Sequence, residues 1–197
     1  MALILRGNGV VEGLTDLPAG SVTAADLASG AITSSALPAG SVLQIVTAHK
    51  TDTFSTLATS SSMAAVPGMS VTITPSSASN KILVMLGCNM GSSADCLVSY
   101  QLYRDSTPIG IGDASGNKPR VTGTAVYASG TDMFYGGIPL SIQYLDSPST
   151  TSAVTYSLKV GQNNNYTVYF NRIGSDRDTT NYDTRSGSSI TVMEVAG

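Results

Sequence analysis

Few residues of this chain are suited to catalysis. His49 is the only histidine, and a nucleophilic serine is usually activated by a histidine within hydrogen-bond reach. No serine near His49 stands in the Gly-x-Ser-x-Gly motif that presents a nucleophile on a sharp turn. Zinc chemistry needs ligands that the chain does not offer. We therefore predict that His49 lies at the surface or at a strand end, that the protein is not an enzyme, and that it uses no cofactor.

The segment Gly174–Gly187 concentrates carboxylates, which Ca²⁺ favours as ligands. Its aspartates are Asp176, Asp178 and Asp183. The glycine and glutamate positions that complete a known calcium loop are not in register. Nearby counter-charges are supplied by Arg172, Arg177 and Arg185. We therefore predict a solvated loop rather than a metal site. Paired carboxylates for glycoside hydrolysis are defined by their spacing in space, and the sequence selects no such pair.

The segment "GQNNNYTVYFNR", from Gly161 to Arg172, combines amides with aromatic side chains. Its three asparagines suit a hairpin tip because asparagine tolerates left-handed backbone, and Tyr166 and Phe170 are predicted to face the core. The alternative is that the amides and tyrosines recognise a sugar or a protein, since loops on rigid scaffolds usually carry binding. The receptor-binding residues would then be Asn163, Asn164, Asn165, Tyr166, Asp176, Arg177, Asp178 and Tyr182.

Two cysteines, Cys88 and Cys96, lie on either side of a predicted loop. They could face each other across a hairpin and form a disulfide. However, two cysteines in a chain of this size do not make a disulfide framework, and their spacing matches no metal motif. We predict unbridged, buried thiols that pack as small hydrophobic side chains.

The composition excludes several classes of partner. Charged residues make up 12% of the chain and the formal net charge is −3, so the basic stripe that neutralises phosphates in nucleic-acid binders is missing. No apolar run approaches the roughly 18–20 residues of a membrane span, and the amino terminus lacks the core of a signal peptide. We therefore expect that the protein does not bind nucleic acid and does not insert into a membrane. We also expect that it is made in a cytoplasm and kept there until it is released.

From about residue 43 the chain reads as a series of short strands. Runs rich in β-branched and aromatic residues alternate with clusters of Gly, Pro, Asn, Asp and Ser at intervals of roughly 8–12 residues. No stretch here has a sustained helical pattern of apolar residues. This predicts an all-β sandwich or jelly roll over residues 43–197, with the apolar run Ile82 to Leu86 as a central strand.

The segment from Leu17 to Gln44 repeats a ten-residue unit. Each unit has a leucine, a glycine three residues later and a β-branched residue five residues later. A segment of about 40 mostly small residues cannot bury these side chains against itself, and copies of the same chain around a rotation axis would bury them in rings. We predict that residues 1–42 are an assembly segment rather than a disordered linker, with packing residues Leu17, Val22, Leu27, Ile32, Leu37 and Val42.

Four stretches carry a resemblance to a known family. They are "ALILRGNGVVEGLTDLPAGSVTAADLASGAITSSALPAGSVLQIVTAHKTDTFST", "VPGMSVTITPSSASNKILVMLGCNMG", "LYRDSTPIGIGDASG" and "GSSITVMEVAG". These stretches resemble the tail-fibre-like virion proteins of bacteriophages, especially cyanobacterial phages, and the resemblance extends along nearly the whole chain.

The resemblance implies a homotrimer that is assembled in the host cytoplasm and exposed on the released particle. Its amino-terminal segment would join other virion proteins, and its β-domain would face outward for attachment to a host surface glycan or protein. The chain is also similar to trimeric cement or head-decoration proteins, which leaves a capsid decoration protein as the alternative. A polysaccharide depolymerase is a further alternative.

Overall fold

The structure is a computed structural model that describes residues 4–5, 11–12, 37–126, 137–178 and 183–197. The chain divides into two units, residues 1–38 and residues 39–197. In the first unit, strands β1 (Ile4–Leu5) and β2 (Val11–Glu12) pair antiparallel. Five residues that the sequence singles out lie outside the described residues: Leu17, Val22, Leu27, Ile32 and Tyr182.

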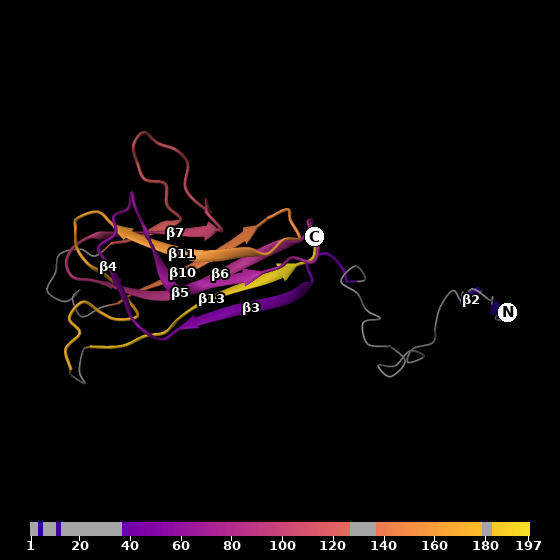
Figure 1. The fold of residues 1–197 in the computed structure, drawn as a ribbon, viewed down its shortest axis with the longest axis horizontal. Helices are drawn as coiled ribbons and strands as arrows, with labels where there is room; N and C mark the ends of the chain where they lie inside the picture. Colours follow the sequence, from indigo (N-terminus) through magenta and orange to yellow (C-terminus); the bar gives the residue numbers. More distant parts are fainter. Residues whose placement is uncertain (1–3, 6–10, 13–36, 127–136, 179–182) are drawn as a thin grey trace. The chain divides into compact units, whose positions relative to one another are not determined.

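The second unit is built from two antiparallel sheets, here called sheet I and sheet II (Figure 1). Sheet I contains β3 (Val42–Lys50), β4 (Phe54–Thr56), β6 (Lys81–Ser92), β10 (Ile138–Asp146), β12 (Val168–Phe170) and β13 (Ser188–Val195). Sheet II contains β5 (Ala64–Ile73), β7 (Leu97–Arg104), β8 (Thr107–Ile109), β9 (Gly123–Val126) and β11 (Val154–Gln162).

The order of the strands is that of a jelly roll. β6 pairs with β10 along one edge and with β13 along the other, and β13 pairs with β3. β12 and β4 continue the positions of β13 and β3 toward one end of sheet I. In sheet II the order is β5, β11, β7, and the outer edge of β7 pairs with β9 along its first half and with β8 along its second half. The predicted all-β sandwich of the jelly-roll type is confirmed.

The core lies between the two sheets and is formed by alternate residues of each strand. Ile82, Val84 and Leu86 of β6 are at most 3% exposed, and they meet Tyr156 and Leu158 of β11, which are fully buried. Burying a side chain of this size stabilises the fold by about 1.5–3 kcal/mol. β6 has partners on both edges, so the prediction that Ile82 to Leu86 is a central strand is confirmed.

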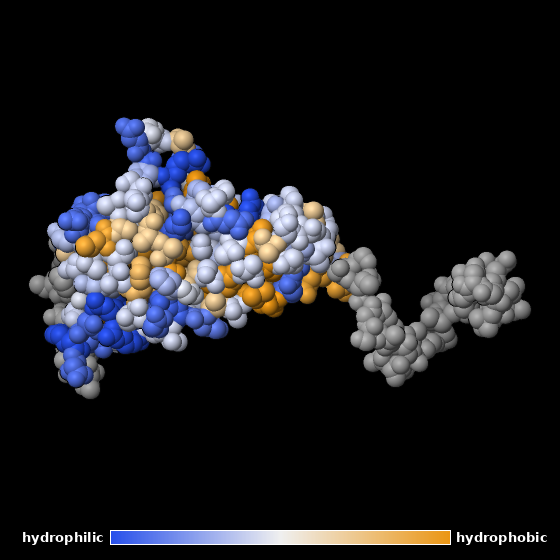
Figure 2. Space-filling view, viewed as in Figure 1, coloured by the Kyte–Doolittle hydropathy of each residue, from blue (hydrophilic) through white to orange (hydrophobic). Residues whose placement is uncertain are grey.

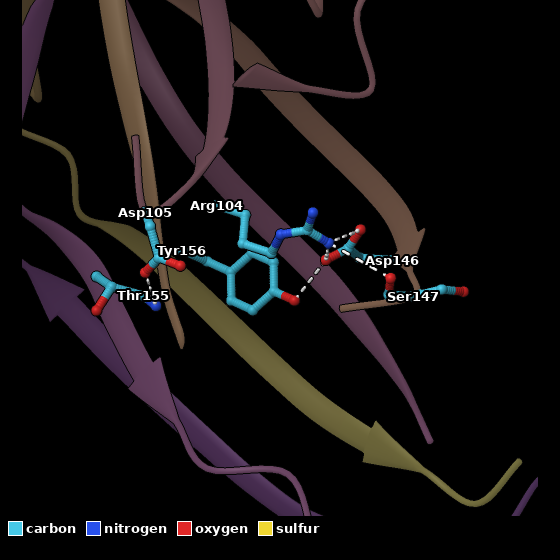
Figure 3. Close-up of polar contacts among 6 residues, drawn as sticks. All are labelled: Arg104, Asp105, Asp146, Ser147, Thr155 and Tyr156. Atoms are coloured by element: carbon cyan, nitrogen blue, oxygen red, sulfur yellow. Dashed lines mark hydrogen bonds and ion pairs between the residues drawn. The ribbon is translucent and has the colours of Figure 1, made fainter. Parts of the chain in front are cut away.

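A buried polar cluster joins the two sheets (Figure 3). Arg104 of β7 donates to both carboxylate oxygens of Asp146 of β10, at 3.0 and 2.9 Å, and the hydroxyl of Tyr156 donates to Oδ2 at 2.7 Å. Burial, and then the hydrogen bond to Asp146, raise the pKa of Tyr156. These contacts connect β7, β10 and β11 and so tie the two sheets together.

The second unit has two distinct ends. At the terminal end, the chain enters beside the C-terminus: the amide of Gly40 donates to the Ala196 carbonyl at 2.8 Å, and the amide of Ala196 donates to the Ser41 carbonyl at 2.9 Å. Because β3, β6, β10 and β13 run antiparallel in turn, the opposite end carries residues 51–63, 93–96, 163–167, 171–178 and 183–187. This opposite end is called the loop end below.

Candidate functional site

The two segments that the sequence singles out for recognition both lie at the loop end (Figure 1). Residues 163–167 precede β12 and residues 171–187 follow it, so a three-residue strand separates the two loops. β12 is short because it pairs only with the last residues of β6 and with β4. The tertiary structure therefore brings both loops to one end of the sandwich without merging them into one pocket.

The loop of residues 163–167 is anchored by polar contacts and presents its side chains to solvent. The side-chain oxygen of Asn163 accepts from the Leu97 amide at 2.9 Å, and the amide of Asn164 donates to the side-chain oxygen of Gln162 at 2.6 Å. Asn165 has a φ of 59°, the left-handed conformation that asparagine tolerates. The side chains of residues 163–166 are exposed.

Two details of this segment correct the prediction. The loop does not turn within a hairpin: it crosses from β11 in sheet II to β12 in sheet I. Phe170 is fully buried as predicted, but Tyr166 is 38% exposed because β12 begins two residues after it. Strand alternation therefore does not extend to Tyr166, and this tyrosine joins the amides on the surface.

A second loop supports this one. Ser93, which follows β6, accepts at its hydroxyl from the Thr167 amide at 2.9 Å and donates its own amide to the Thr167 carbonyl at 2.9 Å. No sequence pattern singles out Ser93, since the contact joins residues 74 positions apart. The reciprocal pair holds the exposed amides of residues 163–165 at a defined place on the loop end.

The loop of residues 171–187 is fastened at its base by Asn171. Asn171 is fully buried, has a φ of 59°, and donates its side-chain amide to the carbonyls of Lys50 at 2.8 Å and Asp52 at 3.0 Å. The hydroxyl of Ser188 donates to the side-chain oxygen of the same asparagine. A buried amide with both ends satisfied fixes the direction in which the loop leaves the sheet.

Two of the three aspartates of this loop are paired with arginines. Asp176 lies between Arg172, at 3.2 Å, and Arg185, at 2.5 Å, and Asp183 pairs with Arg177 at 2.9 Å. The prediction that arginines act as local counter-charges is confirmed. No group of three or more potential metal ligands lies together in the part of the chain that the structure describes.

An arginine–aromatic contact at the base of the same loop was not predicted. The guanidinium of Arg172 lies 3.7 Å from the centroid of the Tyr169 ring, within the range of a cation–π interaction. The sequence "YFNR" places these two residues three positions apart, which is the only signal that could have suggested it. Beyond the base, a shallow hollow is lined by Asp176, Arg177, Asp178, Asp183, Thr184 and Arg185.

The remaining residues with possible chemistry are placed as predicted. His49 is exposed near the end of β3. Cys88 and Cys96 are buried and not bridged. Burial raises the pKa of the Cys88 thiol to about 12, and burial is also the main reason that the pKa of Cys96 is raised.

Among the described residues, no helix is long and apolar enough to cross a membrane.

No protein-family model matches the chain, and no curated protein matches it. Among solved structures, part of the chain is similar to a chain of the infectious bursal disease virus Gx strain, at 9% identity and a TM-score of 0.38, covering 79% of this chain and 43% of that one.

Two further structures are similar over the same part. For the VP2 subviral particle of this virus the identity is 9% and the TM-score is 0.37, with 77% of this chain and 41% of that one covered. For T=1 particles derived from the same virus the identity is 10% and the TM-score is 0.35, with 78% of this chain and 40% of that one covered. The chain therefore spans about two fifths of the length of each of these chains.

Proposed function

We propose that the chain is a structural component of a bacteriophage particle, namely a trimeric tail fibre or fibre tip that contributes to host attachment. The observation that carries the proposal is the polarity of the second unit. The chain enters this unit at the terminal end, beside Ala196, and the exposed residues 163–166 and 176–178 lie at the other end. A part that is anchored through its N-terminal segment would present these loops outward.

The loop end has the properties of a shallow recognition surface. Residues 163–166 offer exposed amides and a tyrosine, while residues 176–178 offer exposed charges. Ser93 holds the first loop in place, and Asn171 and the arginine pairs of Asp176 hold the second. Exposed polar groups on a preordered loop bind with little loss of conformational entropy, which suits a host surface glycan or protein.

The N-terminal segment is proposed to assemble the trimer and to join other virion proteins. Its last two apolar repeat positions belong to the described residues: Leu37 is 40% exposed and Val42 is 51% exposed. Apolar side chains left open at the end of a repeat support a further packing partner. In the proposed trimer, the other two copies of the chain provide that partner.

The deciding experiment is to locate the protein on the particle. Purified particles would be labelled with antibody fragments against the second unit and imaged by electron microscopy. Label at the tail supports the fibre, and label distributed over the head makes the protein a capsid decoration protein instead. Particles without label, in a preparation where an antibody to a known virion protein binds, would refute a structural role.

A second assay addresses the enzymatic alternative. Purified protein would be incubated with isolated host surface polysaccharide, and the release of reducing ends would be measured. The proposal expects no release above that of heat-denatured protein. Release that disappears when one particular Asp or Glu is replaced by its amide would make the protein a depolymerase.

A further inference from the structure

The outer face of sheet I carries a row of apolar side chains that crosses four strands. The register places Leu145 of β10 beside Leu83 of β6, Leu83 beside Met193 of β13, and Met193 beside Ile45 of β3. Leu145 is 49% exposed and Ile45 is 57% exposed. In Figure 2, hydrophobic side chains gather over the part of the sandwich that lies next to the C-terminus in Figure 1.

A hollow lies on the same face, toward the loop end. Its floor is formed by β6 and includes Met85 and Gly87, and its sides are lined by residues of β10 and β13, namely Ser141, Gln143, Ser189, Thr191 and Met193. A Cβ placed on Gly87 would meet no atom within 4 Å. The face therefore combines protruding apolar side chains with an open recess that a side chain of another molecule can enter.

The face lacks acidic groups. Over β10, β6, β13 and β3, all in the described part of the chain, the outward residues include no aspartate or glutamate, and the ionisable ones are Lys81 and His49. Asp146 and Glu194 belong to these strands but point inward and are buried. Two identical copies can therefore meet on this face without the like-charge repulsion that an acidic chain of net charge −3 would otherwise bring.

Sheet II presents a different outer face. It carries hydroxyls and a lysine: Thr72 and Thr155 share a hydrogen bond of 2.8 Å across β5 and β11, and the Lys159 ammonium lies 3.9 Å from the centroid of the Tyr103 ring. Among the described residues, the strongly exposed large apolar side chains Val42, Ile45 and Leu145 lie on strands of sheet I, and none lies on a strand of sheet II. Sheet I is the face that is suited to a partner.

The apolar row lies close to the end of the N-terminal repeat, the segment proposed to assemble the trimer. Val42 is the last apolar position of the repeat and the first residue of β3, where it pairs with Val195. Ile45 follows three residues later on the same strand. We propose that the outer face of sheet I is the surface through which copies of this chain pack against one another, with the occupant of the face being a second copy. This inference rests on the proposed trimer.

The size of the face predicts how strong this contact is. Four strands at about 4.8 Å spacing and four rows of outward residues at about 6.7 Å spacing cover about 500 Å². A stable interface takes about 800 Å² from each partner. The face by itself therefore supports only a weak association. The contact is fully occupied only when the N-terminal segments hold the copies together and raise their effective concentration.

The test uses the full chain and thiol cross-linking. Ile45→Cys places a reactive thiol on the proposed interface, and the native cysteines are buried and do not compete. Thr72→Cys, on the exposed outer face of sheet II, is the matched control. With a short bismaleimide linker, Ile45→Cys should give covalent chain-to-chain products at micromolar concentration, and Thr72→Cys should give background levels.

A second pair of variants tests the hollow. Gly87→Glu adds a charge where the structure has open space, so the fold is retained while the contact is lost, and cross-linking through Ile45→Cys should fall to background. Gly112→Glu makes the same change in the loop between β8 and β9, where an added Cβ also meets nothing within 4 Å, and should leave the yield unchanged.

The outcomes separate this inference from the proposed function. A chain that is trimeric by light scattering but gives no Ile45→Cys product would overturn the interface while leaving the trimer standing. A monomeric chain, or equal yields for Gly87→Glu and Gly112→Glu, would also overturn it. The imaging of particles remains an independent measurement, so a protein found at the tail without this interface would still be a fibre component.

Discussion

Glu194 offers a sharp test of the energetics of the terminal end. This carboxylate of β13 is 1% exposed. Its Oε1 accepts from the Ser76 amide at 2.6 Å, the Ser76 hydroxyl at 2.8 Å and the Asn80 side-chain amide at 2.6 Å, and its Oε2 accepts from the Gln44 side chain at 2.6 Å. One ionised group therefore connects β3, the loop after β5 and β13, and Glu194→Gln removes its charge with little change of shape.

The size of the effect follows from these contacts. In the Glu194→Gln variant, the remaining side-chain oxygen can still accept from the three donors at Oε1. The new NH₂ group replaces Oε2 and cannot accept the hydrogen bond from Gln44, because both groups are donors. Gln44 can turn its oxygen inward only by giving up the 2.8 Å bond to the Thr74 carbonyl. Losing one charge-assisted hydrogen bond costs about 2 kcal/mol. For a domain of this size, that lowers the melting temperature by about 4–8 °C.

The effect should depend on pH in a defined direction. Burial tends to raise the pKa of Glu194, but the hydrogen bonds from Asn80, Gln44 and Ser76 outweigh it and lower the pKa below its ordinary value. An unfolded glutamate has a pKa of about 4.3. The stabilisation is therefore fully present above that pH and is lost as the pH falls through the lower pKa of the folded state.

Thermal unfolding of the wild type and Glu194→Gln would be followed by circular dichroism from pH 7 to pH 3. Asp113→Asn, an exposed carboxylate in the loop between β8 and β9, is the control and should melt like the wild type at pH 7. Glu194→Gln should melt lower at pH 7 and approach the wild type in acid. Equal melting temperatures at pH 7, or a difference that persists unchanged at pH 3, would refute the reasoning.

Three further predictions address the loops, the thiols and the repeat. Asp176→Asn weakens the pairs with Arg172 and Arg185 and should make residues 171–187 more sensitive to protease than in the wild type, as judged by mass spectrometry of the fragments; an unchanged pattern would mean that Asn171 alone holds the loop. Because the pKa of Cys88 is raised to about 12, iodoacetamide should label it at pH 8 only after unfolding, and rapid labelling of the native protein would contradict the burial. Leu27→Ala removes three leucines per proposed trimer, on the order of 6 kcal/mol, and should lower the mass seen by light scattering, whereas an unchanged mass would speak against the rings.

Much of the fold could be predicted from the sequence because it depends on local chemistry. β-Branched runs between turn residues predicted the strands, and the uninterrupted apolar run Ile82 to Leu86 predicted the centre of a sheet, where β6 is found. The thiols of Cys88 and Cys96 are buried as small hydrophobic side chains, as their residue type predicted. The hydroxyl-rich composition of the chain was enough to place His49 at the surface, where it is found.

The candidate site was predictable as two segments but not as one end of the molecule. Asparagine and aspartate clusters mark loops by their own backbone preferences, so residues 163–165 and 176–178 could be identified. Tyr166 was misplaced because strand alternation was extended past the point where pairing with β4 and β6 begins. That point is decided by residues of other strands, which the local pattern does not contain.

By itself, the sequence determined an all-β chain with a repeat at its start, polar loops and no concentration of charge, since each of these follows from composition and local period. Only the tertiary structure decided which residues meet. Alternation assigns Leu83 and Ile45 to a face of their own strands, but strand order and register align them with Leu145 and Met193 in one row. The tertiary structure also buries Glu194 in the interior. The donors that stabilise this internal carboxylate come from segments more than 100 residues away, so the local sequence does not reveal them.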